Sequence, residues 1–258
     1  MNVEEVLHSF YDKGLEEARF SSKHGLVEFL TTTRYIDKYI KAGDRILEVG
    51  CGTGAYTLHY ARRGFEVDAV ELIQKNLEIL RQKLQPSDHV RVVQGNALDL
   101  SGYADNSFDI TLVLGPMYHL FSTEEKLQCL REAQRVTKSG GTMFVAYCQF
   151  DASMVQAGFI RNLYDFLVEN HLLNTENYTP ISNPAGIFEL HRKEQIDALD
   201  ENLYCERLHY VGTDMFTHYY EEQIDQMEES LYQKYLEYLF TICENQNIVG
   251  VSNHTLDI

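Results

Sequence analysis

The segment from Glu48 to Gly54 combines residue types and a spacing that suit the binding of a small ligand. It reads Glu-Val-Gly-Cys-Gly-Thr-Gly and lies between a short apolar run and an amphipathic stretch that starts at Ala55. Glycine has no Cβ, so the chain can turn tightly there and a ligand can approach the backbone. The N–H groups at the start of the following helix attract an anionic group, such as a carboxylate.

The spacing of the glycines distinguishes two classes of ligand. Gly50, Gly52 and Gly54 follow a G-x-G-x-G pattern, whereas dinucleotide-binding turns have their third glycine one position later. The acidic Glu48 precedes the first glycine, and a carboxylate there attracts an ammonium group and repels a pyrophosphate. The turn therefore favours an amino-acid group over a phosphate, and it disfavours a nicotinamide-dependent oxidoreductase.

A second acidic residue, Glu71, follows the next apolar run, about twenty residues beyond the glycines. At this offset a carboxylate accepts hydrogen bonds from both hydroxyl groups of a ribose. The alternative is a solvated carboxylate that is stabilised by the N-terminus of a helix. We prefer the ribose role because both the position and the charge fit it.

The glycine turn resembles the E/D-x-G-x-G-x-G signature of the class I S-adenosylmethionine-dependent methyltransferase family, and the resemblance covers roughly residues 40–150. It implies S-adenosylmethionine as the cofactor. It also implies that Asn96 and the small Ala97 hold the adenine ring, where Asn96 replaces the usual Asp of the family. An amide oxygen accepts the same hydrogen bond more weakly than a carboxylate. An ordinary turn residue is the alternative for Asn96.

The motif and the resemblance together predict a set of cofactor-binding residues from several segments. They are Tyr11, Glu48, Gly50, Cys51, Gly52, Gly54, Glu71, Leu72, Asn96, Ala97 and Leu114. Tyr11 and Arg19 belong to an N-terminal region that resembles the helical caps of small-molecule members of the family. An exposed amphipathic helix is the alternative for that region.

Tyr118 and His119 are the predicted catalytic residues, because they follow the fourth strand-like run, beside the expected methyl group. Methyl transfer from a sulfonium is an in-line displacement in which the protein positions the acceptor and excludes water. A general base is needed only when the acceptor keeps its proton. We predict that His119 removes this proton near neutral pH and that Tyr118 forms a wall of the acceptor site. The alternatives are a buried histidine bonded to a backbone carbonyl and ordinary aromatic packing.

Strand-like runs that alternate with helical stretches are the elements expected to position these residues. The strand-like runs are Arg45–Val49, Glu66–Val70, Val90–Gln94, Ile110–Leu114 and Thr142–Tyr147. The helical stretches between them are Ala55–Arg63, Ile73–Leu84 and Glu124–Thr137, the last ending before the glycine pair Gly140-Gly141. This alternation predicts an α/β fold with helices on both faces of a parallel sheet.

The resemblance extends this prediction to a doubly wound, mostly parallel, seven-stranded sheet of the Rossmann-like kind. Two later runs, Tyr204–Val211 and Ile248–Ile258, are expected to complete the sheet with an antiparallel edge. Residues 1–42 are expected to form a helical cap and residues 43–150 the cofactor-binding core. Residues 151–203 are expected to form an inserted helical lid, and residues 204–258 the rest of the sheet with a long helix at Thr217–Cys243.

The charge of the chain argues against nucleic acid as a partner. Its 39 acidic and 22 basic residues give a net charge of −17, and the basic residues form no stripe. A protein that holds nucleic acid needs clustered Lys and Arg to neutralise phosphates.

The five cysteines are odd in number and contain no CxxC pair, which is typical of reduced thiols in a cytoplasmic protein. No metal is predicted, because the histidines and acids lack a motif such as H-E-x-x-H. No apolar run is long enough to cross a membrane, and no signal peptide is recognisable. We therefore expect a cytoplasmic protein, whose oligomeric state is left open.

The preferred function is the transfer of a methyl group from S-adenosylmethionine to a small-molecule acceptor. The alternatives are a methyltransferase for RNA or protein, and a catalytically silent module that only binds the cofactor. The sequence does not identify the acceptor metabolite or atom.

Overall fold

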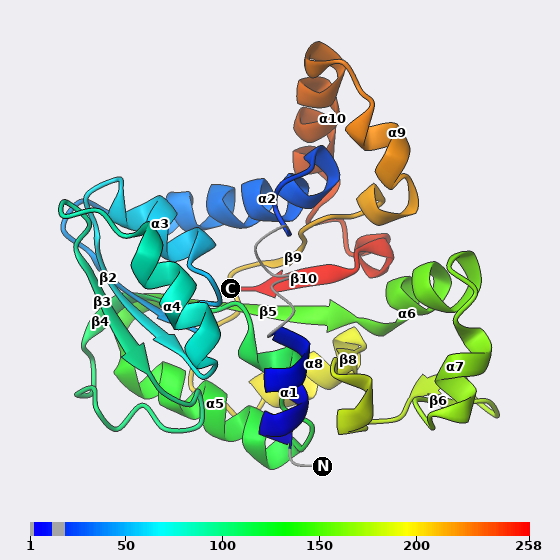
Figure 1. Ribbon diagram of the computed structural model, residues 1–258, viewed down its shortest axis with the longest axis horizontal. Helices are drawn as coiled ribbons and strands as arrows, with labels where there is room; N and C mark the ends of the chain where they lie inside the picture. Colours follow the sequence, from blue (N-terminus) through cyan, green and yellow to red (C-terminus); the bar gives the residue numbers. More distant parts are fainter. Residues whose placement is uncertain (1–2, 12–18) are drawn as a thin grey trace.

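The computed structural model describes residues 3–11 and 19–258. An eight-stranded sheet forms its centre, and helices cover both faces of the sheet (Figure 1). The strands are β1 Arg45–Val49, β2 Glu66–Glu71, β3 Val90–Gln94, β4 Phe108–Val113, β5 Thr137–Gln149, β6 Leu173–Asn174, β7 Thr179–Pro180, β8 Leu190–His191, β9 Tyr210–Gly212 and β10 His254–Asp257.

Ten α-helices are found in the described ranges. They are α1 Val3–Tyr11, α2 Lys23–Tyr39, α3 Ala55–Ala61, α4 Gln74–Lys83, α5 Thr123–Val136, α6 Phe150–Ser153, α7 Tyr164–Glu169, α8 Lys193–Asp200, α9 Glu221–Asp225 and α10 Glu229–Ile242. Short 3₁₀-helices are η2 Pro116–Tyr118, η4 Pro184–Gly186, η5 Thr217–Tyr219 and η6 Val249–Val251, and a π-helix, η3 Met154–Ile160, continues α6.

The strand order confirms the doubly wound, mostly parallel arrangement. It runs β3-β2-β1-β4-β5-β10-β9, and β10 is antiparallel to both β5 and β9. The chain moves outward from β1 through β2 to β3 and then returns to β4 on the other side of β1. The carboxyl ends of β1 and β4 therefore flank the point where the strand order reverses, which is where ligands bind in such sheets.

The two faces of the sheet have separate hydrophobic cores. On one face, Ile36 of α2, Tyr60 of α3 and Leu239 of α10 belong to the same buried cluster as Phe144 of β5. On the other face, α5 and α8 pack on β4 and β5 through a second cluster. Figure 1 shows α2 above the sheet and α5 and α8 below it. Strands that are covered on both faces explain the continuous apolar runs in the sequence.

Side-chain caps fix where the helices that frame the site begin. The Ser22 hydroxyl accepts a hydrogen bond from the Gly25 N–H at 3.1 Å and so starts α2. Ser122 and Glu125 form a reciprocal capping box at the start of α5. Each such cap satisfies N–H groups that the helix itself leaves unpaired.

The prediction of seven strands needs one addition. The short β8, from the predicted lid, pairs in parallel with β5 through Leu190 and His191, and so forms an eighth strand of the sheet. The glycine pair Gly140-Gly141 lies within β5 and does not precede it. The pairing of β5 with β4 shifts register in this region, which accommodates the pair inside a strand.

The long helix predicted at Thr217–Cys243 is wrong, because the chain breaks it into η5, α9 and α10. The break follows from contacts with the start of α2. The Asp225 carboxylate accepts a hydrogen bond from the His24 N–H at 2.9 Å, and Lys23 donates to the Met227 carbonyl. These contacts tie the turn after α9 to the N-terminus of α2, and Met227 packs against the core.

The strand predicted at Tyr204–Val211 is much shorter than expected. Only Tyr210–Gly212 pairs with β10, and Tyr204 is 98% exposed. In the described part of the chain, no helix is both long and apolar enough to span a membrane.

Candidate active site

A cavity of about 370 Å³ lies at the carboxyl ends of the central strands, at the reversal of the strand order. Twelve of the thirteen residues predicted for cofactor binding and catalysis line it. They are Tyr11, Glu48, Gly50, Cys51, Gly52, Glu71, Leu72, Asn96, Ala97, Leu114, Tyr118 and His119. The exception is Gly54.

The three glycines of the turn all have positive φ angles, between 53° and 87°. A Cβ at Gly50 would lie 2.7 Å from the Cδ of Pro116, in the segment after β4. A Cβ at Gly54 would lie 2.3 Å from the Cδ1 of Leu80 in α4. The absence of a Cβ at Gly50 therefore lets Pro116 lie close to the turn beside the cavity. The absence of a Cβ at Gly54 lets Leu80 of α4 pack closely against the turn.

Glu71 ends β2 and is held firmly against the glycine turn. Its Oε2 accepts a hydrogen bond from the Gly52 N–H at 2.8 Å, and its Oε1 accepts one from the Ile73 N–H at 2.9 Å. The residue is 6% exposed and lines the cavity. The side-chain amide of Asn76 also lies 3.5 Å from Oε1, so the carboxylate has a fixed orientation beside the cavity.

Glu48 lies in β1 and is buried like Glu71. It is 2% exposed, and the hydroxyl of Thr57 in α3 donates a hydrogen bond to its Oε2. Burial raises the pKa of Glu48 to about 8. The carboxyl group therefore keeps its proton near neutral pH, and a cationic group beside it would favour the ionised form.

The residues after β2 and β3 make one side of the cavity largely apolar. Leu72, Ile73, Ala97 and Leu98 line it. The Oδ1 of Asn96 accepts a hydrogen bond from the Leu98 N–H at 2.9 Å, which is the turn role considered as an alternative for this residue. Asn96 also lines the cavity, so the turn role and ligand contact are compatible.

His119 and Tyr11 form a hydrogen-bonded pair although 108 positions separate them. The Nδ1 of His119 lies 3.0 Å from the Ile187 carbonyl oxygen, and its Nε2 lies 2.7 Å from the Tyr11 hydroxyl. A carbonyl only accepts, so Nδ1 carries the proton and Nε2 accepts from Tyr11. Burial lowers the pKa of His119 to about 4, which keeps the ring neutral near pH 7.

Tyr118 is 4% exposed, and its hydroxyl donates to the Leu114 carbonyl at 2.7 Å. Its ring centroid lies 4.9 Å from that of His119. The Tyr118 hydroxyl is thus bound to the backbone, and its ring is part of the cavity wall.

The N-terminal segment contributes more of the cavity than the sequence indicated. Arg19 lines it and binds both carboxylate oxygens of Glu28, at 2.7 and 3.0 Å. Phe20 lines it as well and packs edge-on against Tyr56. Single aromatic residues in an amphipathic stretch do not reveal which of them reach a distant site, so Phe20 and Tyr56 were not predicted.

All five cysteines are free, and four of them are buried. Cys51 lines the cavity, and burial raises the pKa of its thiol well above the usual value. This thiol is therefore protonated and acts as a small apolar side chain.

Comparison with known proteins identifies the core of the chain. Residues 47–145 match the family model for a methyltransferase domain. A cypemycin N-terminal methyltransferase from a Streptomyces species is 32% identical over 157 residues, which are 58% of this chain and 60% of that protein. A demethylmenaquinone methyltransferase from Lysinibacillus sphaericus (strain C3-41) is 33% identical over 106 residues, 40% of this chain and 43% of that protein. Other relatives are named for ribosomal RNA as the acceptor.

A solved structure matches nearly the whole chain. A SAM-dependent methyltransferase from Archaeoglobus fulgidus superposes with a TM-score of 0.58 and 17% sequence identity, covering 95% of this chain and 97% of that one. This likeness shows the fold. The present chain spans 60% or less of the length of the two curated relatives above. Residues 47–145 are therefore similar to a methyltransferase domain, and the comparisons support a class I S-adenosylmethionine-dependent methyltransferase.

Proposed function

We propose that this protein is an enzyme that transfers a methyl group from S-adenosylmethionine to a small-molecule acceptor. The observation that carries the proposal is the placement of two buried carboxyl groups, Glu48 and Glu71, beside a glycine turn in one cavity. This set suits a ligand that combines an amino-acid group with a ribose. The bound cofactor would supply an electrophilic methyl group on its sulfonium.

Each part of the cofactor has a matching group in the cavity. Glu71, which Gly52 and Ile73 hold in place beside the cavity, would accept hydrogen bonds from the ribose hydroxyls. Glu48, once ionised, would pair with the ammonium group. Leu72 and Ala97 would contact the adenine ring, and the second lone pair of the Asn96 Oδ1 would accept from its amino group.

Tyr11 and His119 would position the acceptor. Both residues line the cavity, and the Tyr11 hydroxyl donates a hydrogen bond to the Nε2 of His119. We infer that the O–H or N–H of the acceptor would contact this pair. Direct proton removal by His119, the role predicted from the sequence, requires that the Tyr11 hydroxyl leave its Nε2 or pass a proton to it. Tyr118 would form the wall behind the acceptor.

The charged residues around the cavity support a neutral or cationic small molecule. The described lining contains three acidic residues and one basic residue, Arg19, which is paired with Glu28. Nucleic-acid binding uses unpaired Lys and Arg to neutralise phosphates. The net charge of −17 also disfavours nucleic acid as the acceptor, because a negatively charged protein repels a polyanion.

The proposal is tested by measuring the release of S-adenosylhomocysteine from the purified chain with S-adenosylmethionine and a panel of metabolites. We expect release that depends on at least one small molecule. Release only with RNA or with a peptide would show that the acceptor class is wrong. Tight cofactor binding without release for any acceptor would identify a silent binding module and overturn the enzymatic proposal.

A further inference from the structure

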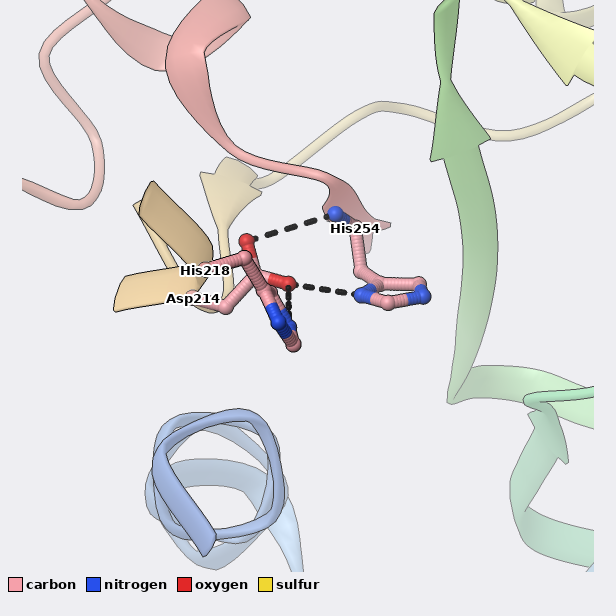
Figure 2. Close-up of side chains that lie close together, drawn as sticks. All are labelled: Asp214, His218 and His254. Atoms are coloured by element: carbon pink, nitrogen blue, oxygen red, sulfur yellow. Dashed lines mark hydrogen bonds and ion pairs between the residues drawn. The ribbon is translucent and has the colours of Figure 1, made fainter. Parts of the chain in front are cut away.

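Asp214, His218 and His254 meet outside the cofactor cavity, at the carboxyl edge of the sheet (Figure 2). Asp214 and His218 come from the segment around η5, and His254 begins β10, where it pairs with Cys148 of β5. We propose that these three side chains, here called the Asp–His cluster, bind a divalent transition-metal ion of the zinc class. The proposal is independent of the proposed methyl transfer.

The positions of three potential ligand atoms fit one ion. The Oδ2 of Asp214 lies 2.6 Å from the Nδ1 of His254 and 3.2 Å from the Nε2 of His218, and all three atoms lie within 4.8 Å of one another. Bonds of about 2.0–2.2 Å to zinc place neighbouring ligand atoms about 3 to 3.5 Å apart. An ion between them therefore requires the distance from the Oδ2 of Asp214 to the Nδ1 of His254, now 2.6 Å, to widen by about 0.4–0.9 Å.

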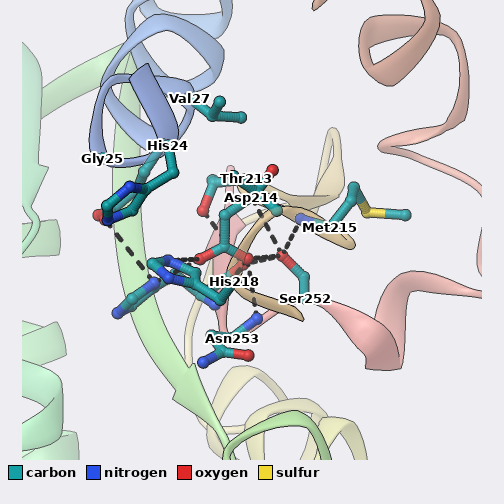
Figure 3. A network of polar contacts seen from close by, with 12 residues as sticks. His24, Gly25, Val27, Thr213, Asp214, Met215, His218, Ser252 and Asn253 are labelled. Carbon is teal, nitrogen blue, oxygen red and sulfur yellow. Dashed lines mark hydrogen bonds and ion pairs between the residues drawn. The ribbon is translucent and has the colours of Figure 1, made fainter. Parts of the chain in front are cut away.

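Further contacts orient these ligands as in known metal sites. The Nδ1 of His218 lies 3.1 Å from the Oε1 of Glu221, which directs its Nε2 toward Asp214. The Oδ1 of Asp214 accepts hydrogen bonds from the Ser252 hydroxyl at 2.5 Å and the Asn253 N–H at 2.8 Å (Figure 3). Metal-binding histidines and carboxylates are typically held by such outer hydrogen bonds. They leave Oδ2 of Asp214 and Nε2 of His218 facing each other.

The charges around the cluster suit a cation. Asp214 is fully buried, whereas the side chains of His218 and His254 are 18% and 21% exposed, so an ion has a path of entry. The neighbouring acids have other partners: Glu221 pairs with Arg161 at 2.7 Å, and Glu28 pairs with Arg19 at 2.7 Å. A buried carboxylate thus remains to balance the ion. Two imidazoles and one carboxylate favour zinc and similar transition metals over magnesium or calcium.

The cluster is linked to the cofactor cavity through α2. The Oε2 of Glu28 lies 3.7 Å from the Nδ1 of His254, and Glu28 holds Arg19, which lines the cavity. A bound ion would join β10 to the segment around η5, beside Glu28 of α2. The sequence analysis predicted no metal, because Asp214 and His218 are four positions apart without a recognised motif and His254 is distant in the chain.

The proposal is tested by metal binding to the full chain after treatment with a chelator. Zinc affinity is measured by competition with a chromophoric chelator, and cobalt binding by visible absorption. We expect one zinc ion per chain, a cobalt spectrum with d–d bands, and no comparable binding of magnesium. His218→Ala and His254→Ala should each weaken zinc binding by more than about tenfold, and Glu221→Gln by about tenfold.

His209→Ala is the matched control, because His209 also contacts a carboxylate, that of Glu244, but lies outside the cluster. It should leave zinc affinity within about twofold of the wild type. Circular dichroism checks that each variant folds, and His218→Gln provides a second, more conservative change. Failure to bind one equivalent of zinc, or equal affinity in folded His218→Ala or His218→Gln and the wild type, would overturn the proposal. The three residues would then form only a hydrogen-bonded ion pair network.

Discussion

Glu48 and Glu71 are both buried carboxyl groups beside the cavity, but their surroundings prepare them for different partners. Two backbone N–H groups donate to Glu71, which therefore has a fixed orientation. Glu48 receives a hydrogen bond from the hydroxyl of Thr57, and its burial favours the protonated form. At the scale of single residues, Glu71 is ready to accept hydrogen bonds, and Glu48 needs a cation to ionise.

Glu48→Gln should make the cofactor-free protein more stable relative to the wild type as the pH rises. The pKa of Glu48 is raised from 4.5 to about 8 in the folded protein. The resulting stabilisation is fully present below pH 4.5 and is lost as the pH rises through 8. The amide side chain in Glu48→Gln does not ionise, so the free energy of unfolding of this variant lacks that loss at high pH. Urea unfolding at pH 5.5 and pH 8.5 should show a relative gain of at least about 1.4 kcal/mol, the equivalent of one pKa unit. An equal difference at both pH values would show that Glu48 is already ionised.

Glu71→Ala should weaken the binding of S-adenosylmethionine by about 1–3 kcal/mol, the usual cost of losing a charged hydrogen-bond acceptor. Titration calorimetry measures this change. Glu66→Ala is the control, because Glu66 lies at the opposite, exposed end of the same strand. The ribose role is wrong if Glu71→Ala binds the cofactor as tightly as Glu66→Ala does.

At the scale of elements, the site is assembled from the turns that follow parallel strands, and a helical cap faces them. The turn after β1, the end of β2 and the segment after β4 all reach the cavity. Tyr11 at the end of α1 reaches His119 after η2. The strand-to-helix turns fix the groups proposed to bind the cofactor, whereas the groups proposed to position the acceptor depend on contacts between distant segments.

Tyr11→Phe and His119→Ala should lower kcat by similar factors and leave the affinity for S-adenosylmethionine nearly unchanged. The double variant should be no slower than the slower single variant, because the two residues act as one unit. The measurement is a double-mutant cycle on kcat with the true acceptor. Multiplicative losses would show that Tyr11 and His119 act separately.

Gly54→Ala should destabilise the protein more than Gly64→Ala does. Both glycines have φ angles near 90°, which costs an alanine about 1–2 kcal/mol. A Cβ at Gly54 also meets Leu80, whereas none of the atoms around Gly64 lies within 4 Å of such a Cβ. Thermal unfolding should show an additional loss of about 1–3 kcal/mol for Gly54→Ala. Equal losses would show that the turn tolerates the contact with α4.

The sequence predicted the elements of the core closely and those of the C-terminal region poorly. β1 and β3 have the predicted bounds, because buried strands between helices produce clear apolar runs. The break between α9 and α10 was not predictable, since Lys23 and His24 cause it from about two hundred positions away. The Tyr11–His119 pair and the Asp–His cluster were hidden for the same reason. Local patterns reveal turns, but not contacts between distant segments.

At the scale of the whole molecule, the doubly wound sheet places the cofactor cavity at its carboxyl edge and the Asp–His cluster at the same edge, beyond β5. The helix α2 connects the two regions through Glu28 and Arg19. The net charge of −17 disfavours polyanionic partners.

The central claim is that the cavity accepts an amino-acid-bearing nucleoside and excludes a dinucleotide. Calorimetric titration of the full chain with S-adenosylmethionine and with NAD tests it most directly. The account predicts saturable binding of one S-adenosylmethionine per chain and no measurable binding of NAD. Binding of NAD in preference to S-adenosylmethionine, or binding of neither, would contradict it.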